Sequence, residues 1–190
     1  MHDPDAELIQ RAGKGEARAA EHIVHRHAER LIRLSKRMLG DAAEAEDVAQ
    51  EVFLRFWKAA PHWRSGEAKL QTWMHRVALN LCYDRLRRRE KPDAEAGLSL
   101  ADPAASPGDV WLQTQRAERV RSALAQLPDR QRAAIALCHF EEASNIDAAS
   151  MLGVSVDALE SLLARGRRAL KIMLADVAPD MGDLGDVRTE

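Results

Sequence analysis

The chain of 190 residues is poor in the residues that build sheets, disulfide frameworks and metal sites. Aromatic residues make up 4% of it, and no stretch alternates apolar and polar residues with the period of a strand. The only cysteines are Cys82 and Cys138, which lack Cys-x-x-Cys spacing. Their apolar surroundings predict buried, reduced thiols, as is usual in a cytoplasmic protein.

The sequence also lacks the patterns of membrane and secreted proteins. No apolar run approaches the roughly 20 residues that a membrane span needs. The first residues, MHDPDAELIQ, have neither the basic region nor the apolar region of a signal peptide. We therefore expect a cytoplasmic protein without a membrane anchor of its own.

Patterns that would predict an enzyme are missing as well. There is no phosphate-binding glycine loop, no Gly-x-Ser-x-Gly and no His-Glu-x-x-His. On a helix, His27 would point away from His22 and His25, and no cysteine or acid pair completes a metal site. We expect surface histidines there, and a solvated acid pair at Glu141 and Glu142. The sequence predicts no catalytic residue, metal, cofactor or small-molecule substrate.

What the sequence does contain is abundant helix-forming residues and an uneven distribution of charge. Charged residues make up 31%, and alanine, leucine, arginine and glutamate are frequent. The net charge of -2 hides a basic block, with eight lysines and arginines against three acids in residues 64–91. Five acids against one base follow in residues 92–118, and residues 176–190 repeat that balance. This distribution favours a local polyanion-binding face.

The first half of the chain has the apolar spacing of four helices. Two are predicted between Ala6 and Leu39, separated by Gly13 and Gly15, and Gly40 ends the second. A third begins after Asp41, which can cap it, and stops before Pro61. The fourth is LQTWMHRVALNLCYDRLRRR, residues 70–89.

The stretch KPDAEAGLSLADPAASPGDV holds three prolines, two glycines and four acids, which predicts a flexible linker. Four helices are predicted after it, of which the third is short and capped by Ser144 or Asn145 and the fourth is long and capped by Ser155. We therefore predict an all-α protein of two small helical domains. The predicted boundaries are a first domain at 1–90, a linker at 91–112, a second domain at 113–176 and an acidic tail at 177–190.

The helix at residues 70–89 is apolar on two faces, which predicts burial between other helices. One polar strip runs between these faces, followed by an arginine cluster at the end of the helix. Arginines suit phosphates, amides and hydroxyls suit base edges, and aromatic rings stack on bases, so the strip favours nucleic-acid binding. An ordinary solvated face with a dipole-complementing basic end is the alternative. The strip comprises Thr72, Arg76, Asn80, Tyr83 and Arg87.

A helix-turn-helix is predicted near the end of the chain. The short helix NIDAASMLG, a turn at Gly153 and a longer basic helix after Ser155 have the required order. A generic helical hairpin gives the same pattern, so this motif alone leaves both interpretations open. Two candidate DNA-binding surfaces joined by a linker are a stronger indication than either one.

Three stretches together resemble bacterial sigma factors of the extracytoplasmic function (ECF) subfamily: DAAEAEDVAQEVFLRFWKAAPHW, LQTWMHRVALNLCYDRLRRR and ALAQLPDRQRAAIAL. The resemblance covers about Ala6 to Ala175. It implies a sigma-two domain that binds the RNA polymerase clamp and opens the -10 promoter element. It also implies a sigma-four domain with a helix-turn-helix that reads the -35 element. The implied function is transcription initiation, stress-responsive and controlled by an anti-sigma factor.

The resemblance assigns roles to individual residues. Those matching the clamp-binding surface are Asp47, Gln50, Glu51 and Leu54. Those matching the -10 surface are Thr72, Trp73, Arg76, Asn80, Arg87 and Arg88, and residues His62 to Leu70 match a loop that takes up a flipped base. Those matching the -35 surface are Ser155, Asp157, Ala158, Ser161, Arg165, Arg167 and Arg168. Core packing remains an alternative role for Trp73.

The sequence departs from the family at three positions. Relatives often have an aromatic residue where this chain has Leu70, and Lys or Arg where it has Glu160 and Leu162, which affects the -35 sequence that it would read. Two other functions stay open at this point. One is a dimeric helix-turn-helix repressor or activator that needs no polymerase, and the other is a sigma mimic that only sequesters an anti-sigma factor.

Overall fold

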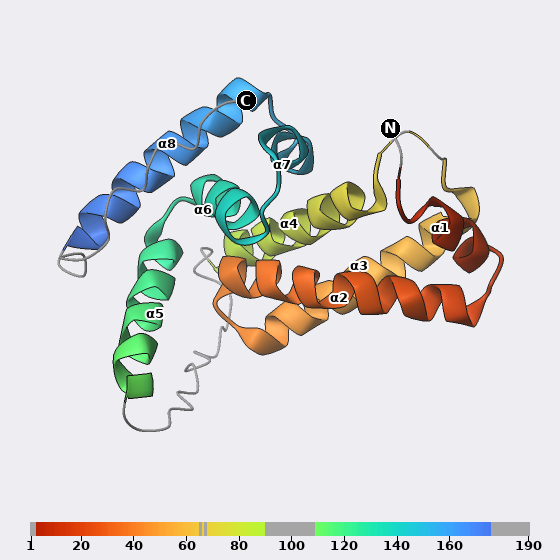
Figure 1. Ribbon diagram of the computed structural model, residues 1–190, viewed down its shortest axis with the longest axis horizontal. Helices are drawn as coiled ribbons and strands as arrows, with labels where there is room; N and C mark the ends of the chain where they lie inside the picture. The colour runs from red at the N-terminus through yellow and green to blue at the C-terminus, as the bar shows by residue number, and fades with distance from the viewer. Residues whose placement is uncertain (1–2, 65, 67, 90–108, 176–190) are drawn as a thin grey trace.

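The structure is a computed structural model that describes residues 3–64, 66, 68–89 and 109–175, with the backbone alone for 109–114. Within these ranges every regular element is helical, and the helices form two groups (Figure 1). The prediction of an all-α fold is confirmed. The predicted tail at 177–190 and most of the predicted linker lie outside the described residues.

The first group contains α1 (Ala6–Gly13), α2 (Ala17–Leu39), α3 (Ala42–Ala59) and α4 (Leu70–Arg89). The α2 helix ends at Gly40, which has a left-handed φ of 76° that a residue with a Cβ rarely adopts. The side chain of Asp41 then caps α3 by accepting a hydrogen bond from the Glu44 amide at 2.8 Å. The α3 helix ends before Pro61, as the sequence predicted, and a 3-10 turn, η1 (Ala60–His62), follows it.

The second group contains α5 (Asp109–Gln126), α6 (Asp129–Ile135), α7 (Asn145–Leu152) and α8 (Val156–Met173). The helix predicted from Asp129 onward changes at Ala136 into a π-helical turn, η2 (Ala136–Phe140). The α5 helix begins inside the range 91–112 that was predicted as linker. Ser144 caps α7 and Ser155 caps α8, each accepting from a backbone amide three residues later.

The core is built around α4, whose buried side chains come from both of its predicted apolar faces. They belong to one continuous apolar cluster that also includes residues of α2, α3, α6 and α8. Arg132 of α6 is buried beside this cluster, and its guanidinium donates to the carbonyl oxygens of Leu124, Ala125 and Leu127 at the end of α5. It also donates to the Met38 carbonyl at 2.5 Å, which ties α6 to α2.

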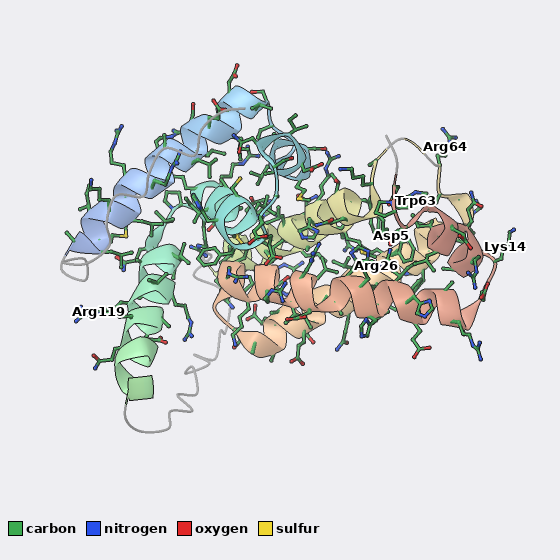
Figure 2. The ribbon with its side chains drawn as sticks, in the orientation of Figure 1. Asp5, Lys14, Arg26, Trp63, Arg64 and Arg119 are labelled. Atoms are coloured by element: carbon green, nitrogen blue, oxygen red, sulfur yellow. The ribbon has the colours of Figure 1, made fainter. Side chains whose placement is uncertain are left out.

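Two residues predicted to be solvated are buried. His27 is 3% exposed, and its Nε2 lies 2.8 Å from the carboxylate of Asp5, which also pairs with Arg26 (Figure 2). Burial alone would raise the pKa of Asp5, but the hydrogen bond and charge of His27, with Arg26, lower it below its ordinary value. The Glu141 side chain is 2% exposed and faces arginines of α2. Both predictions were wrong because helical periodicity carries no information about partners 22 or 104 residues away.

Candidate functional site

The polar strip of α4 is present in the structure, but its members differ in exposure. Arg76, Asn80 and Arg87 are exposed on one side of the helix. Thr72 is only 5% exposed, so its predicted place on an open surface was wrong. The first turn of α4 is enclosed because the Leu70 amide donates to Asp3 at 2.8 Å and α7 lies against this end of the helix.

Aromatic rings pack against the start of α4. Trp73 is half-buried and packs edge to face on Phe56, with ring centroids 6.4 Å apart, and on Trp63, at 5.5 Å. Phe56 also packs edge to face on Trp57 at 4.8 Å. Trp73 therefore contributes to the core with one part of its ring while the rest stays accessible. Figure 2 shows that Trp63 and its neighbour Arg64 lie on the segment that leads into α4.

The arginines at the end of α4 have different roles. Arg89 donates to the Leu39 carbonyl at 2.9 Å and pairs with Glu44 at 2.6 Å, so it anchors the helix to the α2–α3 connection. Arg87 pairs with Asp84 on its own helix, at 2.8 Å, and Arg88 is exposed. The two candidates for DNA contact are thus on the open side of the cluster, and the anchoring role of Arg89 was not visible in the sequence.

The α3 candidates form one exposed surface. Asp47, Gln50 and Leu54 are exposed, and Glu51 is partly exposed beside them, with its carboxylate 2.8 Å from Arg55. The Leu54 side chain is notable because 54% of this large apolar residue is accessible to water. An exposed leucine surrounded by acidic and amide groups is typical of a protein-binding surface with polar edges.

The α8 candidates are all exposed. Five of them lie within about 100° around the helix axis, which is the width of one face: Asp157, Ala158, Ser161, Arg165 and Arg168. Arg167 lies toward the flank, where its charge acts on Cys138 and His139. The opposite face packs on α6 at Gly166, where a Cβ would come within 3.1 Å of the Ile135 side chain. Close packing on one side leaves the other side of α8 free for a ligand.

Two of the three departures from the family pattern, Glu160 and Leu162, lie on α8. Glu160 is exposed and accepts from the Asn145 amide at 3.5 Å, so it belongs to the accessible surface. Leu162 is half-buried and packs against the core cluster. Of the two, only Glu160 therefore lies where it would directly alter contacts to a negatively charged ligand.

Other kinds of site find no support in the part of the chain that the structure describes. That part contains no group of three histidine, cysteine or acidic side chains placed to hold a metal ion. No helix in the same ranges has the length and apolar character needed to cross a membrane. Both cysteines are free, with Cys82 buried and Cys138 half-buried. Burial raises the pKa of the Cys82 thiol to about 12, so this thiol is unreactive.

Sequence comparison assigns each half of the chain to a known family. Residues 23–91 match the family model described as Sigma-70 region 2, and residues 117–170 match Sigma-70, region 4. The ECF RNA polymerase sigma factor SigW of Bacillus subtilis is 32% identical, over 89% of this chain and 96% of the relative. SigM of Mycobacterium tuberculosis, also an ECF RNA polymerase sigma factor, is 34% identical, over 90% and 84%.

Structural comparison agrees with these matches. CnrH, solved in complex with the cytosolic domain of CnrY, has a TM-score of 0.71 and 26% identity, covering 93% of this chain and all of that one. RpoE from Bartonella quintana, solved with the anti-sigma factor NepR, shares the fold with a TM-score of 0.64 at 20% identity. It covers 82% of this chain and 96% of its own. The family is one of transcription initiation factors and not of enzymes. On this sequence identity and coverage, the chain belongs to the ECF RNA polymerase sigma factors.

Proposed function

We propose that this sigma factor binds core RNA polymerase through the α3 surface and directs it to promoters through α4 and α8. In this proposal Asp47, Gln50, Glu51 and Leu54 contact the polymerase clamp. The exposed strip of α4 recognises the -10 element and aids its melting, and the exposed face of α8 recognises the -35 element. Thr72 contributes by packing within the first turn of α4, since its side chain is buried.

The observation that carries the proposal is the exposed polar strip on a helix that is otherwise embedded in the core. Arg76 and Asn80 project from α4, whose other faces are held by Leu70, Met74 and Leu79, all at most 1% exposed. On such a rigid support the backbone is already ordered, so binding a base costs only the rotamer entropy of the side chain itself. If the strip were only an ordinary solvated face, α4 would not need to be buried on both of its other sides.

The test is run-off transcription with purified core polymerase and a pool of promoter fragments randomised in both elements. We expect transcripts only when the chain is added. Glu51→Arg should weaken binding to core polymerase by about 2–5 kcal/mol if Glu51 forms a charge pair with the polymerase that is buried in the complex. Glu46→Arg is the matched control, because Glu46 is an exposed acid of α3 about 140° around the helix axis from Glu51.

The alternatives give different results in the same assay. A self-sufficient regulator would bind promoter fragments as a dimer without polymerase and would support no run-off transcription. A sigma mimic would bind neither polymerase nor DNA. Equal polymerase affinity for the parent chain and Glu51→Arg would remove α3 from the proposal.

The proposal includes cytoplasmic action with the polymerase, control by an anti-sigma factor and a role under stress. CnrH was solved with the cytosolic domain of CnrY, so a chain of this fold can present surfaces to a protein partner. We expect affinity capture on the tagged chain to recover a protein that lowers run-off transcription when it is added back. Recovery of polymerase subunits alone, before and after stress, would contradict this part of the proposal.

A further inference from the structure

The α4 helix begins without a cap from its own sequence neighbours. The Lys69 carbonyl accepts the first intrahelical hydrogen bond, from the Trp73 amide at 3.1 Å, so Lys69 holds the N-cap position. A lysine side chain has donors and no acceptor, so it cannot pair with the first amides of the helix. Instead its Nζ lies 3.2 Å from the Asp147 carboxylate. An acceptor for the start of α4 has to come from elsewhere in the chain.

Asp3 supplies that acceptor from 67 residues away. Its Oδ2 accepts from the Leu70 amide at 2.8 Å, and its Oδ1 accepts from the Asp5 amide at 2.9 Å. Asp5 immediately precedes α1, so one carboxylate joins the starts of α1 and α4. The positive ends of both helix dipoles favour a negative charge at this point. The cap of α4 therefore lies in the first residues of the chain, where no local spacing rule predicts it.

The segment that carries Asp3 is itself fixed to the first helix group. The Asp5 carboxylate is 2% exposed and pairs with Arg26 and with the Nε2 of His27, the latter at 2.8 Å (Figure 2). At the other end of α1, a Cβ on Gly13 would lie 2.7 Å from the Ala60 carbonyl oxygen, so the α1 backbone rests directly on η1. Asp3 is therefore an acceptor whose place is set by α2 and η1 and not by α4.

The first turn of α4 is the part that Asp3 holds, and it leads into the proposed -10 surface. Leu70 is fully buried, and Trp73 packs edge to face on Trp63, with ring centroids 5.5 Å apart. Arg76 follows on the exposed side of the helix. A helix start without a cap frays, and fraying of this turn would move the Trp73 ring and the residues beyond it.

We propose that Asp3 is a positioning residue for recognition of the -10 element. It caps α4 from outside the helix and keeps the first turn in the conformation that binds the opened strand. Asp3 acts through the Leu70 amide and makes no contact with DNA itself. This inference rests on the proposed function of α4.

The cap is tested first without DNA or polymerase, by amide hydrogen exchange in the full chain. Asp3→Ala should speed exchange of the Leu70 amide by about fivefold, the effect of one lost helix cap on an equilibrium. The Glu44 amide, which has a local cap, should exchange at the parent rate. Glu7→Ala is the matched control, because Glu7 is an exposed acid of α1 that pairs within its own helix. An unchanged rate at Leu70 in Asp3→Ala would overturn the cap.

The consequence is measured in the complex with core polymerase, using two DNA probes. One is a single strand carrying the -10 element and the other is a duplex carrying the -35 element, both from promoters that the parent selects from the randomised pool. Asp3→Ala should weaken binding of the single strand by about fivefold and leave binding of the duplex unchanged. Affinity for core polymerase should match the parent, because loss of one cap on α4 leaves α3 folded. Glu7→Ala should change none of the three affinities.

A local cap provides the rescue. Lys69→Ser places a hydroxyl acceptor at the N-cap position. It also removes the pair with Asp147, so this variant serves as its own reference. In the Lys69→Ser background, Asp3→Ala should weaken binding of the single strand by less than about twofold, because the first turn of α4 no longer depends on Asp3.

Three results would overturn the positioning role of Asp3. They are unchanged binding of the single strand by Asp3→Ala, an equal loss of affinity for both probes, and a loss that persists undiminished in the Lys69→Ser background. A parent that binds neither probe would instead contradict the proposed function of α4, and the -10 role of Asp3 with it. The exchange rates would then still decide whether Asp3 caps α4.

Discussion

Helices α4 and α8 carry the two proposed DNA-contacting surfaces, but they are built into the molecule in different ways. The α4 helix is buried on two sides and contains the fully buried His75. The α8 helix has one buried stripe, formed by Leu159, Leu163 and Gly166, and is otherwise open to water. Thr72 of the α4 strip is also buried, whereas every candidate residue of α8 is exposed.

The difference indicates how each surface can be used. A surface on α8 is available at once, and its affinity depends on the side chains that it presents. A surface on α4 is held rigidly by its surroundings, and its geometry depends on the elements packed around it. The comparison therefore predicts that changes beneath α4 affect folding strongly, whereas changes on α8 affect mainly binding.

The largest effect should come from removing the aromatic support of α4. Phe56→Ala deletes a ring that is 0% exposed and touches three tryptophans, so we expect unfolding free energy to fall by about 3–5 kcal/mol. Leu163→Ala, on the buried stripe of α8, is the comparison, and it should lower the unfolding free energy by about 2 kcal/mol. Urea unfolding followed by circular dichroism measures both. A greater loss for Leu163→Ala would reverse the comparison.

The buried His75 should also make the stability that α4 contributes depend on pH. Burial lowers the pKa of His75 from 6.5 to about 4, with the nearby charges of His27 and Arg30 acting in the same direction. The unfolded chain therefore binds more protons between these pH values, and stability falls by about 3 kcal/mol as the pH drops from 6.5 to 4. The pKa of Asp5 in the folded protein lies below its ordinary value of 3.8. As the pH falls below 3.8, the unfolded chain protonates this carboxyl more readily than the folded protein does, so stability decreases further.

His75→Leu isolates this contribution, because it removes the titrating group and the buried Nε2 that has no hydrogen-bond partner. The difference in unfolding free energy between parent and variant should grow as the pH falls from 6.5 to 4. Taking the difference removes the opposite contribution of Glu141, whose pKa is raised by burial. Parallel stability curves over this range would show that His75 is not held neutral.

Base recognition should separate the helices by promoter element. Asn80→Ala removes an exposed amide and little packing, so it should reduce discrimination within the -10 element by roughly 1–3 kcal/mol. Arg165→Ala on α8 should change discrimination only within the -35 element, by a similar amount. Permanganate footprinting of promoter opening with variants of each element measures both. Equal opening of all -10 variants by parent and Asn80→Ala would mean that the strip does not read bases.

The smallest effect is expected from the open end of α4. Arg88→Ala should weaken promoter binding equally on every sequence and reduce the slope of affinity against salt concentration by about one. Arg89→Ala is the contrasting variant, because Arg89 contacts Leu39 and Glu44 and should lower stability more than binding. A sequence-dependent loss for Arg88→Ala would assign this arginine to base contacts.

The sequence alone determined the local structure. Apolar spacing predicted the helices, and Asp41, Ser144 and Ser155 cap them as expected because a cap is a contact between residues three apart. Gly40 and Gly153 end their helices in the left-handed conformation for an equally local reason. The burial of both apolar faces of α4 was predictable too, since a helix that is apolar on two sides has to lie between neighbours.

The tertiary structure alone decided which polar groups remain available. Thr72 has the same helical phase as the exposed strip, but the enclosed first turn of α4 buries it. Arg89 and Arg88 are adjacent in a uniform basic run, yet only Arg89 meets a carbonyl and an acid of the α2–α3 connection. The physical reason is that exposure depends on partners 45 to 104 residues away, which spacing along one helix does not encode.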